Sequence, residues 1–201
     1  LALADEYSTR LEARQLDPFV EEELVAWRES YSDSLHLLLN AVGILAPAGQ
    51  DPERSLRDID VDKLLEVFRV NAALAPLLAK HAKPLFDRHG FALFASLSAM
   101  VGSISDNGVG GWYGYRASKT ALNMFMRNIS VEMRSSHKQF TTAAIHPGTT
   151  ETALSKNFLK CVKHKIWTPE GAAHNIINVL FGVTDEQSGR FWNWDGNEIP
   201  W

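Results

Sequence analysis

The chain has 201 residues, of which 45% are hydrophobic and 22% charged, and its formal net charge is −4 at pH 7. These values are typical of a single globular domain, and the negative charge argues against nucleic acid or an anionic membrane as a partner. The only cysteine, Cys161, excludes an intrachain disulfide and makes a cytoplasmic location the expectation. No apolar run approaches the roughly 20 residues that span a bilayer, and no signal-peptide pattern opens the sequence.

The chain opens on a helix-like segment over 1–18 (LALADEYSTRLEARQLDP). The first predicted strand covers 35–45 (LHLLLNAVGIL). Its apolar residues do not alternate with polar ones, as expected of a strand buried on both faces. A helix is predicted over 61–86, where apolar residues recur at helical spacing and Asp60 or Asp62 can cap the first turn.

A second strand is predicted over 90–99 (GFALFASLSA), followed by a helix over 115–134. The third strand, over 140–148 (FTTAAIHPG), is β-branched and stops at a proline and a glycine, which mark a loop. The last predicted helix covers 169–183, with Thr168 as its N-cap and Pro169 in the first turn, where proline is tolerated.

Alternating strands and helices predict an α/β fold, namely a doubly wound parallel sheet with helices on both faces and right-handed crossovers. We expect one domain over 1–201. Such a sheet usually begins with a strand and a glycine-rich turn, and the sequence shows neither. We therefore expect the given sequence to lack the first strand and its glycine turn, together with another segment near Tyr7 and Ser8.

Tyr115 and Lys119 stand four residues apart in the predicted helix 115–134, so their side chains should share one helix face. A free tyrosine has a pKa near 10, and a neighbouring ammonium lowers this pKa by favouring the phenolate. Such a pair suits carbonyl reduction or alcohol oxidation, in which a proton moves at the substrate oxygen. The accompanying hydride requires a nicotinamide cofactor, because side chains cannot supply it.

The pair alone is a weak signal, because Y-x-x-x-K arises by chance in a chain like this roughly one time in five. The alternative is a tyrosine packed on the sheet and a lysine in solvent. The context of the pair is more specific. In order along the chain stand LLLNAVG, VFRVNAALAP, SLSAMVGS, YRASKTALN and HPGTTETAL. Together these segments resemble the motifs of the short-chain dehydrogenase/reductase family, and VGSISDNGVGGWYGYRASKTALNM with the tail SGRFWNWDGNEIPW resembles its C-factor-like branch, whose members are mostly bacterial.

The resemblance, which extends from Asp17 to the end of the chain, implies a Rossmann-like fold that binds NAD or NADP, with NADP slightly favoured. It implies that Tyr115 is the catalytic tyrosine. Lys119 would lower its pKa and also bind the nicotinamide ribose. Asn71 matches an asparagine that holds a proton-relaying water, although in a helix it can instead be satisfied by the backbone.

Further cofactor contacts follow from the same resemblance. Asn40 and Gly43 match the ends of an Asn-Asn-Ala-Gly motif beside the adenine ribose, in which Ala41 replaces the second asparagine. Asp17 matches an aspartate that meets the adenine amine, and a turn or cap residue is the alternative. The remaining implied contacts to the nicotinamide side are Pro147, Gly148, Thr150 and Thr152.

The catalytic serine of the family is not where the resemblance places it. That position, three residues before Gly102, is Ala99. Ser98 and Ser103 are the nearby hydroxyls, and we favour Ser98, turned toward the cleft by a bulge at the strand end. Losing this serine would cost rate without abolishing the proton path.

Other segments carry weaker signals. Cys161 and His164 form a C-x-x-H, but without further ligands we expect no metal site. The basic and aromatic loop 155–167 is either a solvated surface loop or a covering loop that prefers acidic substrates. Trp192, Trp194 and Trp201 favour core or subunit packing over ligand contacts. The resemblance also implies a homodimer or homotetramer, formed through the helices that carry Asn71 and Tyr115.

Altogether the sequence predicts an NAD(P)-dependent oxidoreductase that interconverts a small carbonyl compound and its alcohol. A dinucleotide-binding or signalling protein with little catalysis is one rival, and Ala99 favours it. A sugar-nucleotide epimerase or dehydratase shares the Tyr–Lys pair, but it normally needs a longer C-terminal domain than the roughly fifty residues after Pro147.

Overall fold

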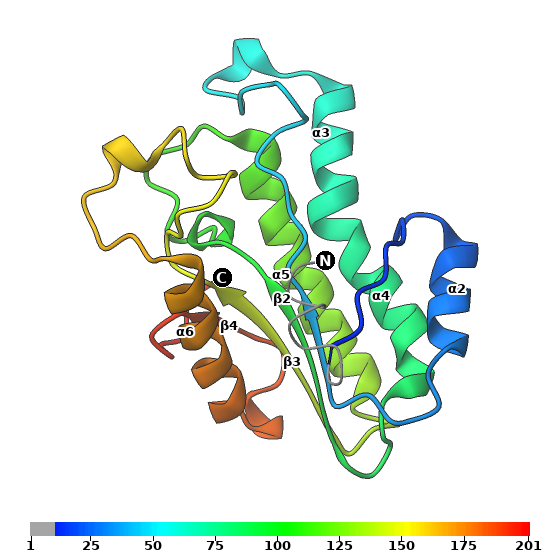
Figure 1. Ribbon diagram of the computed structural model, residues 1–201. Helices are drawn as coiled ribbons and strands as arrows, with labels where there is room; N and C mark the ends of the chain where they lie inside the picture. The colour runs from blue at the N-terminus through cyan, green and yellow to red at the C-terminus, as the bar shows by residue number, and fades with distance from the viewer. Residues whose placement is uncertain (1–10) are drawn as a thin grey trace.

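The short apolar runs of the sequence pair side by side in one parallel sheet (Figure 1). The computed structural model describes residues 11–201. Within them the strand order is β1-β2-β3-β4 and all pairs are parallel. The strands are β1 (Leu37–Asn40), β2 (Phe91–Leu97), β3 (Gln139–His146) and β4 (Arg190–Asn193).

Helices occupy the connections between these strands. The α-helices are α2 (Glu21–Glu29), α3 (Val61–Phe68), α4 (Leu74–Ala82), α5 (Tyr113–Met133) and α6 (Pro169–Gly182). A π-helical turn, η2 (Arg69–Ala73), joins α3 to α4. Short 3-10 turns are η1 (Leu56–Asp58), η3 (Lys83–Leu85), η4 (Met100–Gly102), η5 (Leu159–Cys161) and η6 (Asp185–Gln187).

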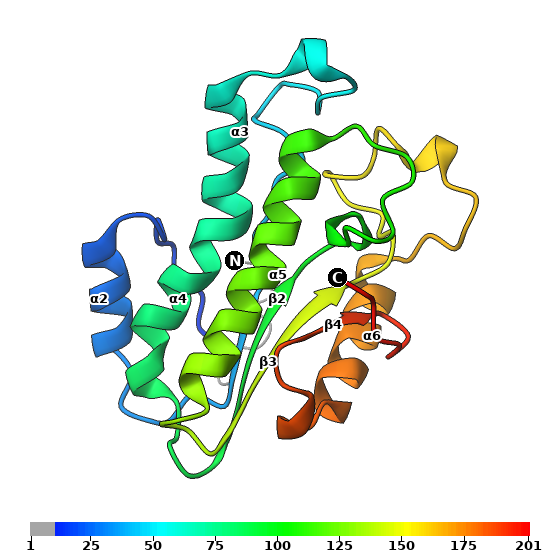
Figure 2. The same cartoon turned by 180° about the vertical axis from the view of Figure 1, so that it is seen from behind.

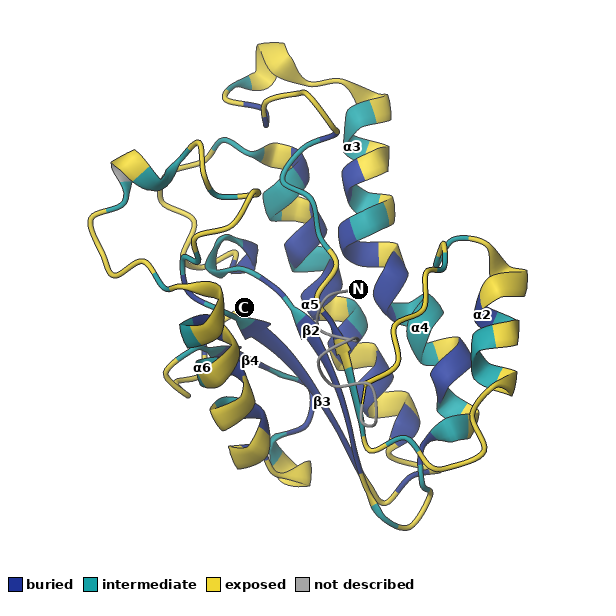
Figure 3. Cartoon of the chain, viewed as in Figure 1, coloured by how far each residue is buried: buried dark blue, intermediate teal, exposed yellow. Residues whose placement is uncertain are grey.

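The sheet is covered on both faces, as the sequence predicted. Ala92 and Phe94 of β2 pack with α4 and α5 in one hydrophobic cluster. Their neighbours Leu93 and Ala95 pack with α6 in a second cluster on the other face. Figures 1 and 2 show α5 and α6 on opposite sides of the strands. Burial follows this layering, because most residues of β2 and β3 are buried and the outer surfaces of α2 and α6 are exposed (Figure 3). The edge strand β1 is less covered, and its Leu39 is exposed.

The expected right-handed crossovers cannot hold for all three connections. Each step from β1 to β4 moves in the same direction across a parallel sheet. The first two connections pass over the face covered by α4 and α5, but the third passes over the face covered by α6. The β3–α6–β4 connection therefore has the opposite hand to the two before it, against a strong general preference.

The predicted helices agree closely with the structure, whereas the strands are shorter than predicted. The segment 61–86 is interrupted by η2, and the strand predicted over 35–45 keeps only Leu37–Asn40. Asp60, and not Asp62, caps α3 by accepting from the Lys63 N–H at 3.0 Å. Thr168 caps α6 by accepting from the Gly171 N–H at 3.1 Å, as predicted.

Two elements were not predicted, namely α2 and β4. The helix-like pattern at the start of the sequence lies mainly in residues 1–10, outside the described residues, and 11–17 have no regular structure. Among the helices described, none is both long and apolar enough to cross a membrane.

Candidate active site

The carboxyl ends of β1, β2 and β3 lie at the same edge of the sheet. Asn40 is in register with Ser96, and Leu97 with Ile145. Ligand sites of open α/β sheets form outside such strand ends. Helix α5 begins at this edge. Lys119 in its second turn donates to the Leu97 main-chain oxygen at 2.7 Å, which places that turn at the end of β2.

Tyr115 and Lys119 lie on the same side of α5. The Lys119 Nζ is 5.8 Å from the centroid of the Tyr115 ring. Lys119 is only 3% exposed, whereas Tyr115 is half-buried. The lysine is therefore not a solvated surface residue, and the tyrosine is the member of the pair that a ligand at the strand ends can reach.

Burial sets the pKa values of both groups. It raises the pKa of Tyr115 to about 12 and lowers the pKa of Lys119 to about 8, because the charged form of each is poorly solvated. The sequence predicted that Lys119 lowers the pKa of Tyr115. Burial of the phenol is the cause of the shift in this structure, and the effect of the lysine on the tyrosine stays a prediction. The Lys119 amine is committed to Leu97, and desolvation of the phenol dominates.

Asn71 lies in the π turn η2, and its side chain is fully engaged. Its Oδ1 accepts from the Ile44 N–H at 2.8 Å, and its Nδ2 donates to the Ile44 oxygen at 2.8 Å and to the Ser118 hydroxyl at 3.1 Å. Ser118 in turn donates to the Tyr115 main-chain oxygen at 2.8 Å. The side chain thus links the segment after β1 to α5. These bonds to the Ile44 main chain match the alternative given above, in which the Asn71 side chain is satisfied by the backbone.

Gly43 is the point where this network meets Lys119. A Cβ atom at Gly43 would lie 3.3 Å from both the Asn71 Oδ1 and the Lys119 Nζ, so any side chain there would crowd both polar groups. Before it, Asn40 is buried and its Oδ1 accepts from the Val42 N–H at 3.1 Å. Ala41 is exposed in the turn between them.

Ser98, which the sequence favours as the catalytic serine, is engaged within the protein, and its catalytic role stays a prediction. Ser98 is 4% exposed, and its hydroxyl donates to the Asn123 Oδ1 at 2.7 Å, beneath α5. Its N–H still pairs with the Ile145 oxygen at 2.8 Å, so the strand pattern continues and the bulge that would turn it inward is absent there. Ser103 is also buried and donates to the Pro200 oxygen. Ala99, by contrast, is partly exposed.

Asp17 makes the contacts of a turn residue, and its contact with the adenine amine stays a prediction. Its carboxylate accepts from the Phe19 N–H at 2.9 Å, and its own N–H donates to Glu23 at 2.7 Å. The side chain is exposed at the start of α2. These contacts explain an acid before a proline without a ligand.

The loop after β3 is shaped by two tryptophans. Gly148 has φ +77, and a Cβ there would lie 2.8 Å from Trp167 and 2.9 Å from Trp194, so only glycine fits. The two indoles meet edge to face at 4.9 Å. Thr150 is part-buried and donates to the Gly148 oxygen at 3.3 Å, whereas Thr152 is exposed. Pro147 precedes this turn directly after β3.

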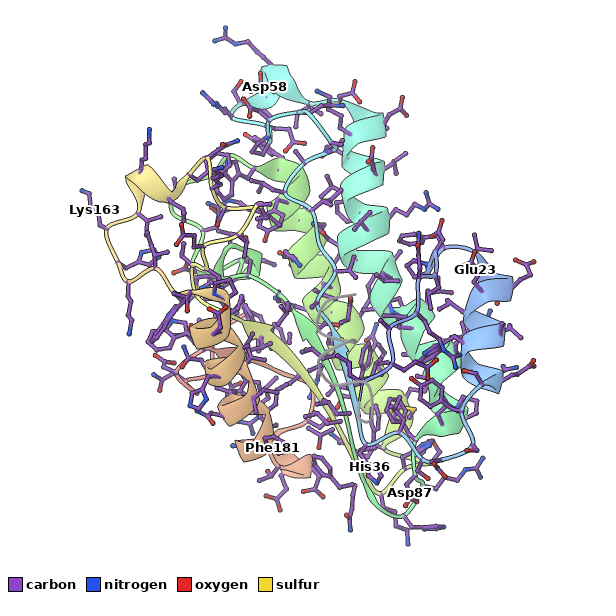
Figure 4. All side chains as sticks on the ribbon, viewed as in Figure 1. Glu23, His36, Asp58, Asp87, Lys163 and Phe181 are labelled. Carbon is purple, nitrogen blue, oxygen red and sulfur yellow. The ribbon has the colours of Figure 1, made fainter. Side chains whose placement is uncertain are left out.

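The other tryptophans of the tail pack within the chain. Trp192 is buried in the cluster beneath α6, and Trp201 stacks on Phe191 at 5.9 Å. The lysines of the loop 155–167 are exposed, and Lys163 projects away from the molecule in Figure 4. His164 is also exposed and contacts the Thr149 hydroxyl at 2.8 Å. Among the side chains that the structure describes, which leave out Cys161, no three His, Asp or Glu residues gather in a way that could hold a metal ion.

Sequence reasoning missed Glu53, which lies at the start of α5. Its carboxylate accepts from the Gly114 N–H at 3.1 Å, and its main-chain oxygen accepts from the Trp112 N–H at 2.5 Å. Glu53 is 5% exposed, and the N-cap residue Trp112 makes no side-chain cap bond. The carboxylate therefore supplies the missing cap from another segment, where the helix dipole favours it. Nothing in the local sequence indicates this contact.

The comparisons with known proteins identify the family. A family model described as Enoyl-(Acyl carrier protein) reductase matches residues 16–172. The C-signal of Myxococcus xanthus is 32% identical over 148 residues, covering 73% of this chain and 84% of that protein. The chain belongs to the short-chain dehydrogenase/reductase family.

Other members of the family support its chemical class. A 1-hydroxy-2-glutathionyl-2-methyl-3-butene dehydrogenase of Rhodococcus sp. is 35% identical over 71% of this chain, which spans 61% of that enzyme. A putative short-chain dehydrogenase/reductase of Burkholderia multivorans with bound NADP superposes with a TM-score of 0.83 at 25% identity, covering 100% of this chain and 81% of that one. Several named relatives are dehydrogenases or oxidoreductases, and this protein is a short-chain oxidoreductase.

Fold similarity extends to carbonyl reductases. NADPH-bound carbonyl reductase from chicken fatty liver superposes with a TM-score of 0.84 at 24% identity, over 100% of this chain and 81% of that one. In the present chain, Gly43 lies against the Lys119 amine with no room for a side chain, and we call this arrangement the Gly43 cradle. The glycine-rich turn of the family has no counterpart within residues 11–201.

Proposed function

We propose that the protein is an NAD(P)-dependent oxidoreductase that interconverts a carbonyl compound and an alcohol. One observation carries the proposal: Tyr115 and Lys119 lie on the same side of α5 at the carboxyl edge of the sheet, with Gly43 beside the lysine amine. A partly exposed phenol beside a buried amine is suited to moving a proton at a substrate oxygen.

In the reducing direction, Tyr115 donates its proton to the substrate oxygen. A pKa raised to about 12 keeps the phenol protonated at neutral pH and so ready to donate. Lys119, with a pKa lowered to about 8, can return a proton toward the tyrosine and regain one from water near neutral pH. When bound, a reduced nicotinamide supplies the hydride that reaches the carbonyl carbon.

The cofactor is NAD or NADP, and the similarity to an NADP-bound family member slightly favours NADP. We assign its nicotinamide end to Tyr115, Lys119 and Gly43, with the loop residues Pro147, Gly148, Thr150 and Thr152. We assign the adenine ribose to the turn formed by Asn40 and Ala41. The proposed NAD(P)-binding domain comprises the whole chain, 1–201.

We also propose that the protein forms a homodimer or homotetramer through the helices that carry Asn71 and Tyr115. An open apolar groove of about 510 Å³ lies on the far side of α5 from Lys119. Ala117, Ala121 and Met124 of α5 line it, facing Val101 and Ile104 of the preceding loop. A second copy packed here would cover these side chains. Light scattering of the purified protein tests this assembly.

The rival is a dinucleotide-binding protein without efficient catalysis, which Ala99 favours. Purified protein with NADPH and a panel of aldehydes and ketones separates the two. Tyr115→Phe should lower turnover at least about 100-fold. Tyr31→Phe is the matched control, because this exposed tyrosine lies outside both the site and the groove, and it should change turnover less than about threefold. NADPH binding without turnover of any compound would favour the rival.

A further inference from the structure

Trp112 has a backbone conformation that a tryptophan rarely adopts. Its φ is 51° and its ψ is 46°, and it is the one non-glycine residue with positive φ among residues 11–201. The left-handed region is strained for a bulky side chain, and such strain persists only where the surroundings impose it. Here the Glu53 oxygen holds the Trp112 N–H at 2.5 Å, and Arg116 holds the Gly111 oxygen at 3.1 Å.

The strained backbone places the indole directly beside the candidate catalytic tyrosine. The Trp112 ring meets the Tyr115 ring edge to face, with centroids 6.2 Å apart. On its other side it meets the Phe158 ring edge to face at 5.1 Å. Phe158 comes from the loop after β3, more than forty residues farther along the chain.

We call Trp112 and Phe158 the aromatic wall. Both rings are only half-buried, as is Tyr115, so part of their apolar surface is open beside the phenol. Tyr115 has Lys119 and the Gly43 cradle on one flank and the wall on another. The first flank is where the cofactor is assigned, which leaves the wall to contact the substrate.

We propose that the aromatic wall makes the enzyme selective for carbonyl compounds whose carbonyl is attached to an aromatic ring. Two rings already arranged edge to face offer a third ring the offset and edge-on contacts that aromatic groups prefer. A flexible alkyl chain would gain less there and lose more conformational freedom on binding. The inference rests on the proposed function, since it names the substrate class of the same site.

Benzaldehyde and heptanal test this selectivity, because they have equal carbon counts and differ in the ring. We expect the wild type with NADPH to have the higher kcat/KM for benzaldehyde. Trp112→Ala and Phe158→Ala should each lower the benzaldehyde-to-heptanal ratio by roughly five- to tenfold. Phe181→Ala is the control: this side chain is 77% exposed on α6, far along that helix in Figure 4, and the ratio should not change.

Binding gives a readout that does not depend on turnover. Isothermal titration with benzyl alcohol and 1-heptanol should show tighter binding of the aromatic alcohol, and Phe158→Ala should remove that difference. Phe158 lies in a loop, so this variant remains informative if Trp112→Ala fails to fold. Equal ratios in wild type and both variants, or preference for the alkyl compounds, would overturn the proposal. Selective binding without turnover supports the wall and counts against the proposed catalytic function alone.

Discussion

The Lys119 amine donates to the main-chain oxygen of Leu97 at 2.7 Å, which pins helix α5 to the carboxyl end of β2 through a buried cation. Burial lowers the pKa of Lys119 to about 8, so protonation of this amine opposes folding. The unfolded chain holds the proton up to its ordinary pKa of 10.5. Stability therefore increases as pH rises from about 8 to 10.5 and is independent of this group below that window.

Lys119→Met should consequently be inactive yet more stable than wild type at pH 7, by roughly 1 to 2 kcal/mol once the lost hydrogen bond is subtracted. The advantage should shrink as pH rises through the window. Urea unfolding at pH 7 and pH 10 measures it, with Lys138→Met as the control because Lys138 is exposed. A variant less stable than wild type at pH 7 would show that the amine is net stabilising.

Glu53 should be needed for the start of α5. Glu53→Ala leaves the buried Gly114 N–H without its acceptor, so we expect a loss of about 1 to 2 kcal/mol in the free energy of unfolding. Glu53→Gln keeps an acceptor oxygen without the charge and should lose less than half of this. Glu66→Ala, at an exposed helical position, is the control and should stay within about 0.5 kcal/mol. Equal stability of Glu53→Ala and wild type would show that the Glu53 carboxylate does not stabilise the start of α5.

Two variants that each add or remove one hydroxyl test which position, 98 or 99, serves as the site of the catalytic serine. Ala99→Ser restores a donor at the family position, on a partly exposed residue, and should raise kcat for reduction by about tenfold. Ser98→Ala removes the bond to Asn123 and should cost about 1 kcal/mol of stability with kcat nearly unchanged. A large loss of kcat in Ser98→Ala, with no gain in Ala99→Ser, would return the catalytic role to Ser98.

The sequence predicted most of the architecture because periodicity reports burial. Helix α5 was found by its apolar spacing, and the four-residue interval between Tyr115 and Lys119 set their shared side. Helix α2 was not predicted because Leu24 is its one buried residue, which leaves little amphipathic pattern in the sequence. Strand β4 was not predicted because it has only four residues and is recognised by its pairing with β3.

Site details that depend on distant contacts were beyond the sequence. The pattern could not show that Ser98 continues the strand, because that depends on the Ile145 oxygen of a neighbouring strand. Glu53 lies 61 residues before the Gly114 N–H that it caps. The direction of the Tyr115 pKa depends on how deeply the phenol is buried, which spacing does not report.

The last prediction concerns the contribution of Asn71 to stability. Its side-chain amide pairs with the main chain of Ile44 after β1 and with Ser118 of α5. Asn71→Ala removes three hydrogen bonds and leaves the Ile44 N–H and C=O unpaired, so we expect a loss of about 2 to 4 kcal/mol in the free energy of unfolding.

Asn71→Asp keeps the acceptor for the Ile44 N–H but loses both donated bonds, so its loss should be intermediate. Asn128→Ala, at an exposed position on α5, is the control and should stay within about 0.5 kcal/mol. Because Gly43 lies against the Asn71 Oδ1, KM for NADPH should rise together with the loss of stability. If kcat fell while stability and KM stayed constant, Asn71 would act in proton relay and not through the Ile44 pairing.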